Sequence, residues 1–275
     1  MKTVVVIGGG PAGMMAAGTA ASLGAHVTLL EPNGKLGKKL FITGKGRCNV
    51  TNNCAGDEVL KNVPTNPRFL YGALAGFSPA DAMAFFEEHG CQLKTERGNR
   101  VFPESDQAGS VIDALRRFLK ETGVEIRWER ALEIEAADGA VTGVRTQTGR
   151  LPADRVILAT GGCSYPATGS TGDGYRLAGS LGHTIIEPRG SLVPLVEKGH
   201  TCGAMQGLAL KNVEVKLLDA KGKCVFSEFG ELLFTHFGLS GPVILSASCH
   251  MQRGKEGYRI VMDLKPALDE KKLDA

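Results

Sequence analysis

Three glycines near the N-terminus, Gly8, Gly10 and Gly13, are spaced as G-x-G-x-x-G and directly follow a short apolar run. Glycines at this spacing allow a tight turn, a close approach of the backbone to a phosphate, and close packing of a following helix. Pro11 and Ala12 suit the first turn of that helix, whose free N–H groups and positive dipole end attract anions. The pattern predicts that these five residues bind the pyrophosphate of a dinucleotide.

An acid, Glu31, follows a second apolar run, Val27 to Leu30, about twenty residues after the glycines. A carboxylate at this place can accept hydrogen bonds from ribose hydroxyls. Its charge would repel a 2′-phosphate, which favours FAD or NAD over NADP. Strand, glycine turn, small-residue helix, second strand and acid occur in order, so we prefer dinucleotide binding to an accidental glycine-rich turn.

A second polar segment, LFITGKGRCNVTNN at residues 40–53, has the composition of a loop. Its positive charges, together with a lysine just before it, could bind a pyrophosphate or an anionic reduced flavin. Its hydroxyl and amide side chains could add hydrogen bonds, while a solvated basic loop is the open alternative. The candidate cofactor contacts in and beside this segment are Lys39, Thr43, Gly46, Arg47 and Asn49.

Two cysteines, Cys48 and Cys54, lie where flavin disulfide reductases carry a redox pair, but the spacing between them is longer than in those enzymes. Two unpaired thiols are therefore the preferred interpretation. His236 lies between Thr235 and Phe237 and could deliver a proton near neutral pH, although such a histidine is more often a packed side chain. His236, Arg47 and Cys48 are the catalytic candidates, and the sequence does not choose among them.

Two later segments combine glycines with groups that could contact a cofactor. RVILATGG, residues 155–162, predicts a buried strand whose small-residue end brings Thr160 and Gly161 near the ligand. In GSTGDGYRLAGSLGH, residues 169–183, glycine turns precede a helix that Asp173 can cap. Each segment alone also fits an ordinary strand end or capped helix. After a dinucleotide turn, the two favour FAD over NAD.

The rest of the sequence predicts the helices and strands that position these groups. Capping residues and apolar spacing predict helices over residues 78–89 and 107–121, and alternation predicts a strand at residues 124–128 and a small meander over residues 132–153. By analogy with other flavin-binding folds, Ala131 would lie beside the adenine. Alternating strands and helices predict an α/β fold with a parallel sheet.

The last third of the chain has a different pattern. Val213, Val215 and Leu217 alternate with polar or charged residues, which predicts antiparallel strands. A helix is expected over residues 240–250, and the first turns of another after Pro266. This part of the chain is expected to be β-rich.

Five segments, IGGGPAGMMAA, TGKGRCNVTN, ATGG, GSTGDGYRLA and THFGLSGP, occur in this order along the chain. In this ordered set the chain resembles the BaiN-like, or aminoacetone-oxidase-like, family of NAD(P)/FAD-dependent oxidoreductases. The ATGG and TGDG pair also resembles the flavoprotein subunits of fumarate reductases. The resemblance implies a noncovalent FAD, NAD(P)H as a transient electron donor, and hydride transfer between flavin N5 and an activated carbon, for example that of a conjugated enone.

The resemblance also implies a domain organisation. We expect an α/β, glutathione-reductase-type Rossmann-like FAD domain over residues 1–189 and an inserted, β-rich, substrate-side domain over residues 190–275. Members of the family return to the FAD domain through a glycine-rich segment that this sequence lacks, so we expect both domains to be truncated. An inactive FAD-binding remnant is the main alternative function, followed by a flavin dithiol reductase and an RNA-modifying flavoprotein.

Composition limits the partners and the location. The net charge of +3 is scattered along the chain, so the sequence does not predict a nucleic-acid surface. Seven dispersed cysteines without C-x-x-C spacing favour a reduced compartment. We expect a cytoplasmic protein with a small-molecule substrate and with no metal, membrane or nucleic-acid partner; the oligomeric state stays open.

Overall fold

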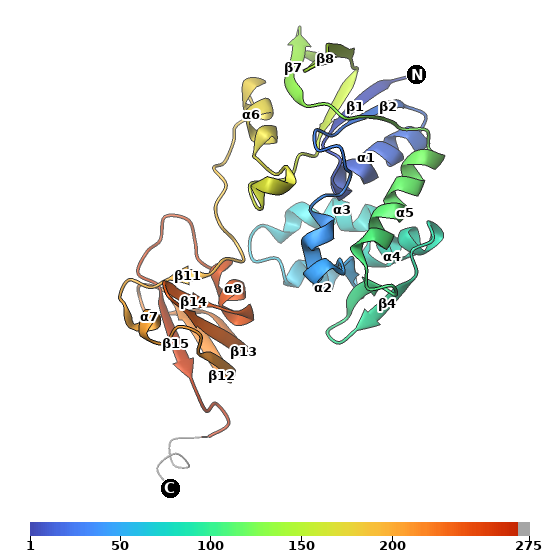
Figure 1. Cartoon of the computed structure of the whole chain (residues 1–275). Helices are drawn as coiled ribbons and strands as arrows, with labels where there is room; N and C mark the ends of the chain where they lie inside the picture. The colour runs from blue at the N-terminus through green and yellow to red at the C-terminus, as the bar shows by residue number, and fades with distance from the viewer. Residues whose placement is uncertain (269–275) are drawn as a thin grey trace. The chain divides into compact units, whose positions relative to one another are not determined.

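The computed structural model describes residues 1–268, which form two compact units (Figure 1). The first unit spans Met1–Pro188 and the second begins at Arg189. The helix expected after Pro266 falls mostly outside the described residues, and the chain up to Leu268 forms a turn there, closed by a hydrogen bond from its N–H to the carbonyl of Lys265 (2.9 Å).

A four-stranded parallel sheet is the centre of the first unit. Its strands are β1 (Thr3–Ile7), β2 (His26–Leu30), β6 (Glu125–Arg127) and β10 (Arg155–Leu158), in the order β10-β1-β2-β6. The central strands β1 and β2 are almost fully buried, as expected when both faces of a parallel sheet are covered. The sequence predicted a buried β10, but it is an edge strand and only half-buried.

Two helices, α1 (Pro11–Ser22) and α5 (Ala108–Glu121), pack together on one face of this sheet. Met14, Leu115 and Leu119 belong to the buried cluster between helices and sheet. The apolar stripe of α5 thus faces the sheet. The helix predicted over residues 107–121 is confirmed.

The opposite face of the sheet packs against a small antiparallel meander and a helix. Val5 and Ile7 of β1 share a buried cluster there with Val144 and Leu177. The meander predicted over residues 132–153 is confirmed. Its elements are β7 (Ala131–Ala137), β8 (Ala140–Thr146) and β9 (Arg150–Pro152), and the helix is α6 (Asp173–Ser180).

Residues 40–53 are more ordered than the predicted loop. Residues 40–46 form a kinked 3-10 segment, η1 (Leu40–Gly46), and β3 (Thr51–Asn52) joins a small antiparallel sheet in the order β3-β5-β4. The loop prediction was therefore wrong for these two elements. The partner strands and the short helix that follows are β4 (Leu93–Glu96), β5 (Arg100–Pro103) and α2 (Gly56–Lys61).

One described stretch, Pro67–Glu88, has the length and mean hydropathy (1.2) of a membrane-spanning segment. The structure divides it into η2 (Pro67–Leu70), α3 (Tyr71–Gly76) and α4 (Pro79–Glu88), and the backbone is extended between the last two. A capping box with Ser78 starts α4, which confirms the helix predicted over residues 78–89. A membrane-spanning helix needs about 20 continuous residues. This stretch has the length and hydropathy of a membrane span, but it does not form one continuous helix.

The second unit is a five-stranded sheet in the order β11-β14-β13-β12-β15. Val213, Val215 and Leu217 are buried on one side of its long strand β12, which confirms the predicted alternation. The helix expected to reach residue 250 ends at Ser248. The elements are β11 (Leu195–Val196), α7 (Thr201–Ala204), β12 (Ala209–Leu218), β13 (Cys224–Thr235), β14 (Gly238–Ser240), α8 (Pro242–Ser248) and β15 (Arg259–Asp263).

Candidate nucleotide-binding site

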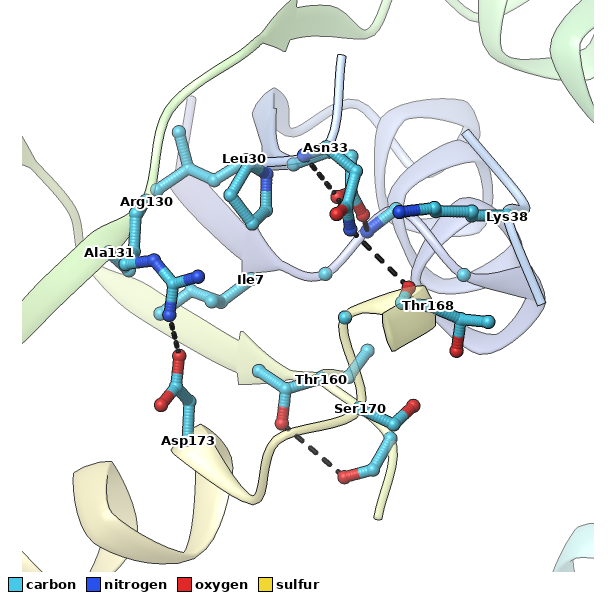
Figure 2. Close-up of a pocket in the computed structure, with 18 of the residues that line it drawn as sticks. Ile7, Leu30, Asn33, Lys38, Arg130, Ala131, Thr160, Thr168, Ser170 and Asp173 are labelled. Atoms are coloured by element: carbon cyan, nitrogen blue, oxygen red, sulfur yellow. Dashed lines mark hydrogen bonds and ion pairs between the residues drawn. The ribbon is translucent and has the colours of Figure 1, made fainter. Parts of the chain in front are cut away.

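A cavity of about 310 Å³ lies at the carboxyl ends of β1 and β2 (Figure 2). Open parallel sheets bind ligands in this position, outside the carboxyl ends of the strands where the strand order reverses. Ten of the predicted cofactor contacts line the cavity. They are Gly8, Gly10, Pro11, Ala12, Glu31, Lys39, Ala131, Thr160, Gly161 and Asp173.

Each glycine of the first motif has its own structural reason. A side chain on Gly8, which has a φ of +112°, would overlap the carbonyl of Ala159. A Cβ on Gly13 would overlap the carbonyl oxygen of Gly8, so only glycine lets α1 pack this closely against the turn. A Cβ on Gly10 would meet no atom within 4 Å, and Gly10 lines the cavity. Gly10 is therefore where a ligand can approach the backbone.

The N-terminus of α1 has the features of an anion-binding site. No side chain caps Gly10, and the first turn of the helix carries no acidic residue. The first N–H groups of a helix lack intrahelical acceptors, and the dipole adds positive potential there. Because Pro11 and Ala12 line the cavity, this end of the helix can bind a phosphate.

Glu31 is only 6% exposed and is held in place by hydrogen bonds. One carboxylate oxygen accepts the N–H of Gly9 at 2.9 Å, and the other accepts the backbone N–H of Asn33 at 2.8 Å and its side-chain amide at 2.7 Å. A carboxylate has about four acceptor positions, so at least one is left for a ribose hydroxyl. Glu31 is therefore held in a fixed orientation by the protein and can still accept a hydrogen bond from a ligand.

The predicted phosphate ligand Lys39 lines the cavity but already has protein partners. Its ammonium group donates to the backbone oxygen of Ser164 at 2.7 Å and to the hydroxyl at 3.2 Å. Its neighbour Lys38 donates to the carbonyl of Ala167 at 2.8 Å. The two lysines fasten one wall of the cavity, and each keeps donors that could still contact a ligand.

An ion pair crosses another wall of the cavity. Arg130 and Asp173 are 2.6 Å apart, and both line the site (Figure 2). The sequence assigned Asp173 as a helix cap, but Gly172 is the N-cap of α6 and no side chain caps it. The capping prediction was wrong because the carboxylate pairs with Arg130 instead.

Five predicted contacts do not line this cavity: Gly13, which packs α1 against the turn, and Thr43, Gly46, Arg47 and Asn49 of the second segment. The Arg47 guanidinium donates to Asp106 at 2.7 Å, bonds to Glu96, and lies 4.1 Å from the ring centre of Phe102. Hydrogen bonds to Glu96 and Asp106 raise the pKa of Arg47. The role of the four residues of the second segment toward a cofactor stays a prediction.

The side chains of Thr43 and Asn49 are likewise engaged within the protein. The Thr43 hydroxyl donates to the carbonyl of Leu40 at 2.8 Å. The Asn49 amide donates to the carbonyls of Thr51 and Val101, both at 2.9 Å. These bonds fold the segment onto itself.

Of the remaining catalytic candidates, Cys48 does not line the cavity and His236 belongs to the second unit. Cys48 is buried, and burial raises the pKa of its thiol, which disfavours the reactive thiolate. Cys48 and Cys91 belong to one apolar cluster, whereas Cys54 is half-buried outside it. His236 is exposed in the second unit, beside Phe237, so the packed side chain expected for it is not found.

Several cavity residues were not predicted from the sequence. Gly9 donates to Glu31, Asn33 bonds to Glu31 and Thr168, and Arg130 pairs with Asp173. Arg130 directly precedes the predicted Ala131, which is the only sequence signal that could have pointed to it. Across residues 1–268, no group of three or more His, Cys, Asp or Glu residues could hold a metal ion.

The parallel sheet, the glycine turn and the cavity define a Rossmann-type dinucleotide-binding unit. Residues 2–243 match the model of the HI0933-like protein Rossmann domain, and the chain belongs to this family. The predicted α/β Rossmann-type fold and the resemblance based on the sequence motifs are both confirmed.

The relatives are longer proteins. The chain is 34% identical over 277 residues to the 3-dehydro-bile acid delta(4,6)-reductase of Clostridium scindens, covering 98% of this chain and 66% of that protein. It is 31% identical over 251 residues to the ribosomal RNA dihydrouridine synthase of Escherichia coli, covering 91% of this chain and 61% of that protein. The chain thus spans less than two thirds of the length of these relatives.

A solved structure shares the fold. The open conformation of a flavocytochrome c3 fumarate reductase aligns with a TM-score of 0.56 and 22% identity, over 77% of this chain and 47% of that chain. At this identity the likeness shows the fold alone.

Proposed function

We propose that the protein is a FAD-dependent oxidoreductase that transfers hydride between the flavin and an activated carbon of an organic substrate, with NAD(P)H as the electron donor. The observation that carries this proposal is the pairing of an uncapped α1 N-terminus at Gly10 with an oriented, buried Glu31 in one cavity. The first suits a pyrophosphate and the second suits the adenosine ribose.

The residues present fit FAD. Gly10 leaves open space where a pyrophosphate must approach, and the first N–H groups of α1 face it. Glu31 can accept from the ribose, and its charge disfavours a 2′-phosphate at the same place. Ala131, the first residue of β7, also lines the cavity, and by fold analogy it would lie beside the adenine.

FAD, when bound, supplies hydride transfer at N5, and the protein binds, orients and tunes it. Lys38 and Lys39 fix the wall formed by residues 164–170 and add positive charge beside the pyrophosphate position. The Arg130–Asp173 pair joins α6 to the start of β7 and so holds two walls at a constant separation.

The substrate class that we propose is a carbon–carbon double bond conjugated to a carbonyl group. The Clostridium scindens relative is named as a delta(4,6)-reductase of a 3-dehydro-bile acid, and such a 3-oxo compound with that unsaturation is a conjugated enone. Hydride addition to the far carbon of an enone is favourable because the carbonyl oxygen takes up the developing charge. A small enone is therefore the first substrate to test.

A second candidate substrate is a uracil ring in ribosomal RNA, also a double bond conjugated to a carbonyl. The observation that favours it is the Escherichia coli relative named as a ribosomal RNA dihydrouridine synthase. The scattered net charge of +3 does not form the concentrated basic surface that RNA binding usually needs. We therefore keep the small enone as the preferred substrate.

The test is an absorbance spectrum of the purified chain after incubation with FAD and desalting, followed by anaerobic NADH or NADPH. We expect retained flavin peaks that bleach with one of the donors and return when an enone is added. If the flavin peaks return when a ribosomal RNA transcript is added but not when an enone is added, the second candidate substrate is favoured. Flavin that never bleaches would indicate binding without activity, and a colourless protein would contradict the proposal.

A further inference from the structure

A turn at residues 164–169, which contains the 3-10 helix η3 (Pro166–Thr168), is tied to the segment that follows Glu31. Three side chains of residues 33–39 each donate to a backbone carbonyl of this turn, 125 to 135 residues further along the chain. Residues of both segments line the cavity (Figure 2). The three contacts are Asn33 with Thr168, Lys38 with Ala167, and Lys39 with Ser164.

Asn33 differs from the two lysines because its amide also binds Glu31. The amide nitrogen lies 2.7 Å from a Glu31 carboxylate oxygen and 3.4 Å from the Thr168 carbonyl oxygen. An amide NH2 group has two N–H donors, whereas an ionised carboxylate has none. One side chain therefore serves two acceptors, one on each of the two segments, and only a donor fits between them.

The turn packs closely against the Asn33 amide. Gly169 has a φ of +101°, and a Cβ at this position would lie 2.4 Å from the amide nitrogen of Asn33. That nitrogen is at the end of a side chain, so it can move away, but the movement would take it from its acceptors on Glu31 and Thr168. The position of the turn and the orientation of Asn33 thus depend on each other.

We propose that Asn33 is a positioning residue for the adenosine ribose, an inference that rests on the proposed function. It acts through Glu31, because its amide fixes the carboxylate and joins it to the turn at residues 164–169. An acceptor that is already fixed loses little conformational freedom when a ligand hydroxyl binds to it, which favours affinity. Lys38 and Lys39 hold the same turn at two further carbonyls.

The pH profile of ADP binding to Asn33→Asp tests this role. The substitution keeps the size of the side chain but places a second carboxylate at hydrogen-bond distance from Glu31. Two carboxylates this close repel each other, which raises the pKa of the introduced group. Once protonated, that group can again donate to Glu31. By titration calorimetry, ADP affinity relative to the wild type should be at least about tenfold lower at pH 8 and recover to within about threefold near pH 5.

Two further variants serve as references for this profile. Asn33→Ala should bind ADP roughly tenfold more weakly at both pH values, because it cannot regain the hydrogen bond. Asn53→Asp should bind ADP like the wild type, since Asn53 is exposed outside the cavity lining and donates only to the Thr95 hydroxyl at 3.3 Å. The other charged residues of the lining are the same in every variant, so their titration cancels in the ratio to the wild type. They are Lys38, Lys39, Glu129, Arg130 and Asp173.

Gly169→Ala measures the coupling between the turn and Asn33. In the wild-type background the added Cβ pushes against the amide, and ADP affinity should fall by roughly tenfold. In the Asn33→Ala background the amide is absent, so the second substitution costs only the strain of a positive φ. The two substitutions should therefore be non-additive, with the double variant at least about threefold tighter than the product of the single effects.

The outcomes separate this inference from the proposed function. If the wild-type chain binds ADP and FAD, but the affinity of Asn33→Asp relative to the wild type is the same at both pH values, the positioning role is overturned while the proposed function stands. Additive effects of Asn33→Ala and Gly169→Ala would overturn it in the same way. If the wild-type chain binds neither ADP nor FAD, both fail together.

Discussion

The glycine turn at residues 8–13 and the basic segment at residues 39–49 both looked like cofactor sites, but the structure uses them differently. The turn keeps its helix N–H groups free and opens them onto the cavity. In the basic segment, Lys39, Arg47 and Asn49 all have hydrogen-bond partners within the protein. In this chain glycine spacing places free backbone groups at the cavity, whereas the charged side chains of the basic segment have partners within the protein.

The physical reason is the number of hydrogen-bond partners that each kind of group can reach within the protein. A glycine motif specifies a backbone path, and the N–H groups along that path have few internal acceptors. A lysine or arginine can reach any carboxylate or carbonyl within several ångströms, so its type alone does not tell which partner it has.

The largest effect is expected for Gly13→Ala. The added Cβ would overlap the Gly8 carbonyl, and neither backbone can move without displacing α1 from β1. We expect Gly13→Ala to lose about 3 kcal/mol of unfolding free energy, which corresponds to roughly 6–12 °C in melting temperature. The variant should also lose FAD binding. Thermal unfolding followed by circular dichroism would measure the loss of stability.

Gly10→Ala is the matched control for that variant. Its Cβ meets nothing within 4 Å, so the melting temperature should stay close to that of the wild type. FAD affinity should fall by at least about tenfold, because the methyl group enters the cavity where the pyrophosphate approaches. A Gly10→Ala variant that unfolds early, or that binds FAD normally, would contradict this account of the turn.

Glu31→Gln should have the next largest effect on binding. Replacing the carboxylate removes a charge-assisted acceptor for the ribose, worth about 1.5–3 kcal/mol, so FAD should bind roughly 10- to 100-fold more weakly. Titration calorimetry with FAD measures this loss. Equal affinities of the wild type and the variant would show that Glu31 only orients Gly9 and Asn33.

Arg47→Met should leave FAD affinity nearly unchanged and lower the melting temperature slightly at neutral pH. The Lys94 and Arg47 hydrogen bonds lower the pKa of Asp106, and Arg47 lowers that of Glu96. Lowered folded-state values give stability that is present above the unfolded values of about 4 and lost as pH falls through the folded ones. The difference between variant and wild type should therefore shrink below about pH 4, as melting curves at several pH values would show.

The smallest effect is expected for Cys54→Ser, which should leave flavin reduction unchanged. Burial raises the pKa of Cys48, and burial with the nearby Cys48 raises that of Cys91 to about 11. Iodoacetamide at neutral pH should therefore label the exposed Cys163 and Cys224 before either buried thiol. Loss of flavin reduction in Cys54→Ser would instead support a dithiol mechanism.

The sequence predicted those parts of the fold that local pattern determines. The β1–α1–β2 unit, α4 with its capping box, α5 and the meander were all found from periodicity and capping residues. The edge position of β10 was missed, because exposure of a strand depends on which neighbours it pairs with and not on its own residues.

The site was predictable to the same extent. Gly10, Glu31 and Asp173, which the sequence singles out beside recognisable turns, all line the cavity. The pairing of Arg130 with Asp173 and of Lys39 with Ser164 joins residues far apart in the chain. Such contacts leave no periodic trace in a single sequence.

The central claim is that the cavity at Gly10 and Glu31 binds the adenosine and pyrophosphate half of FAD. It is tested most directly by titrating FAD into the wild-type chain and then competing with ADP, with Gly10→Ala titrated in parallel. We predict that FAD binds, that ADP displaces it, and that the variant binds both ligands more weakly. FAD binding that ADP does not displace and that Gly10→Ala does not weaken would contradict the claim.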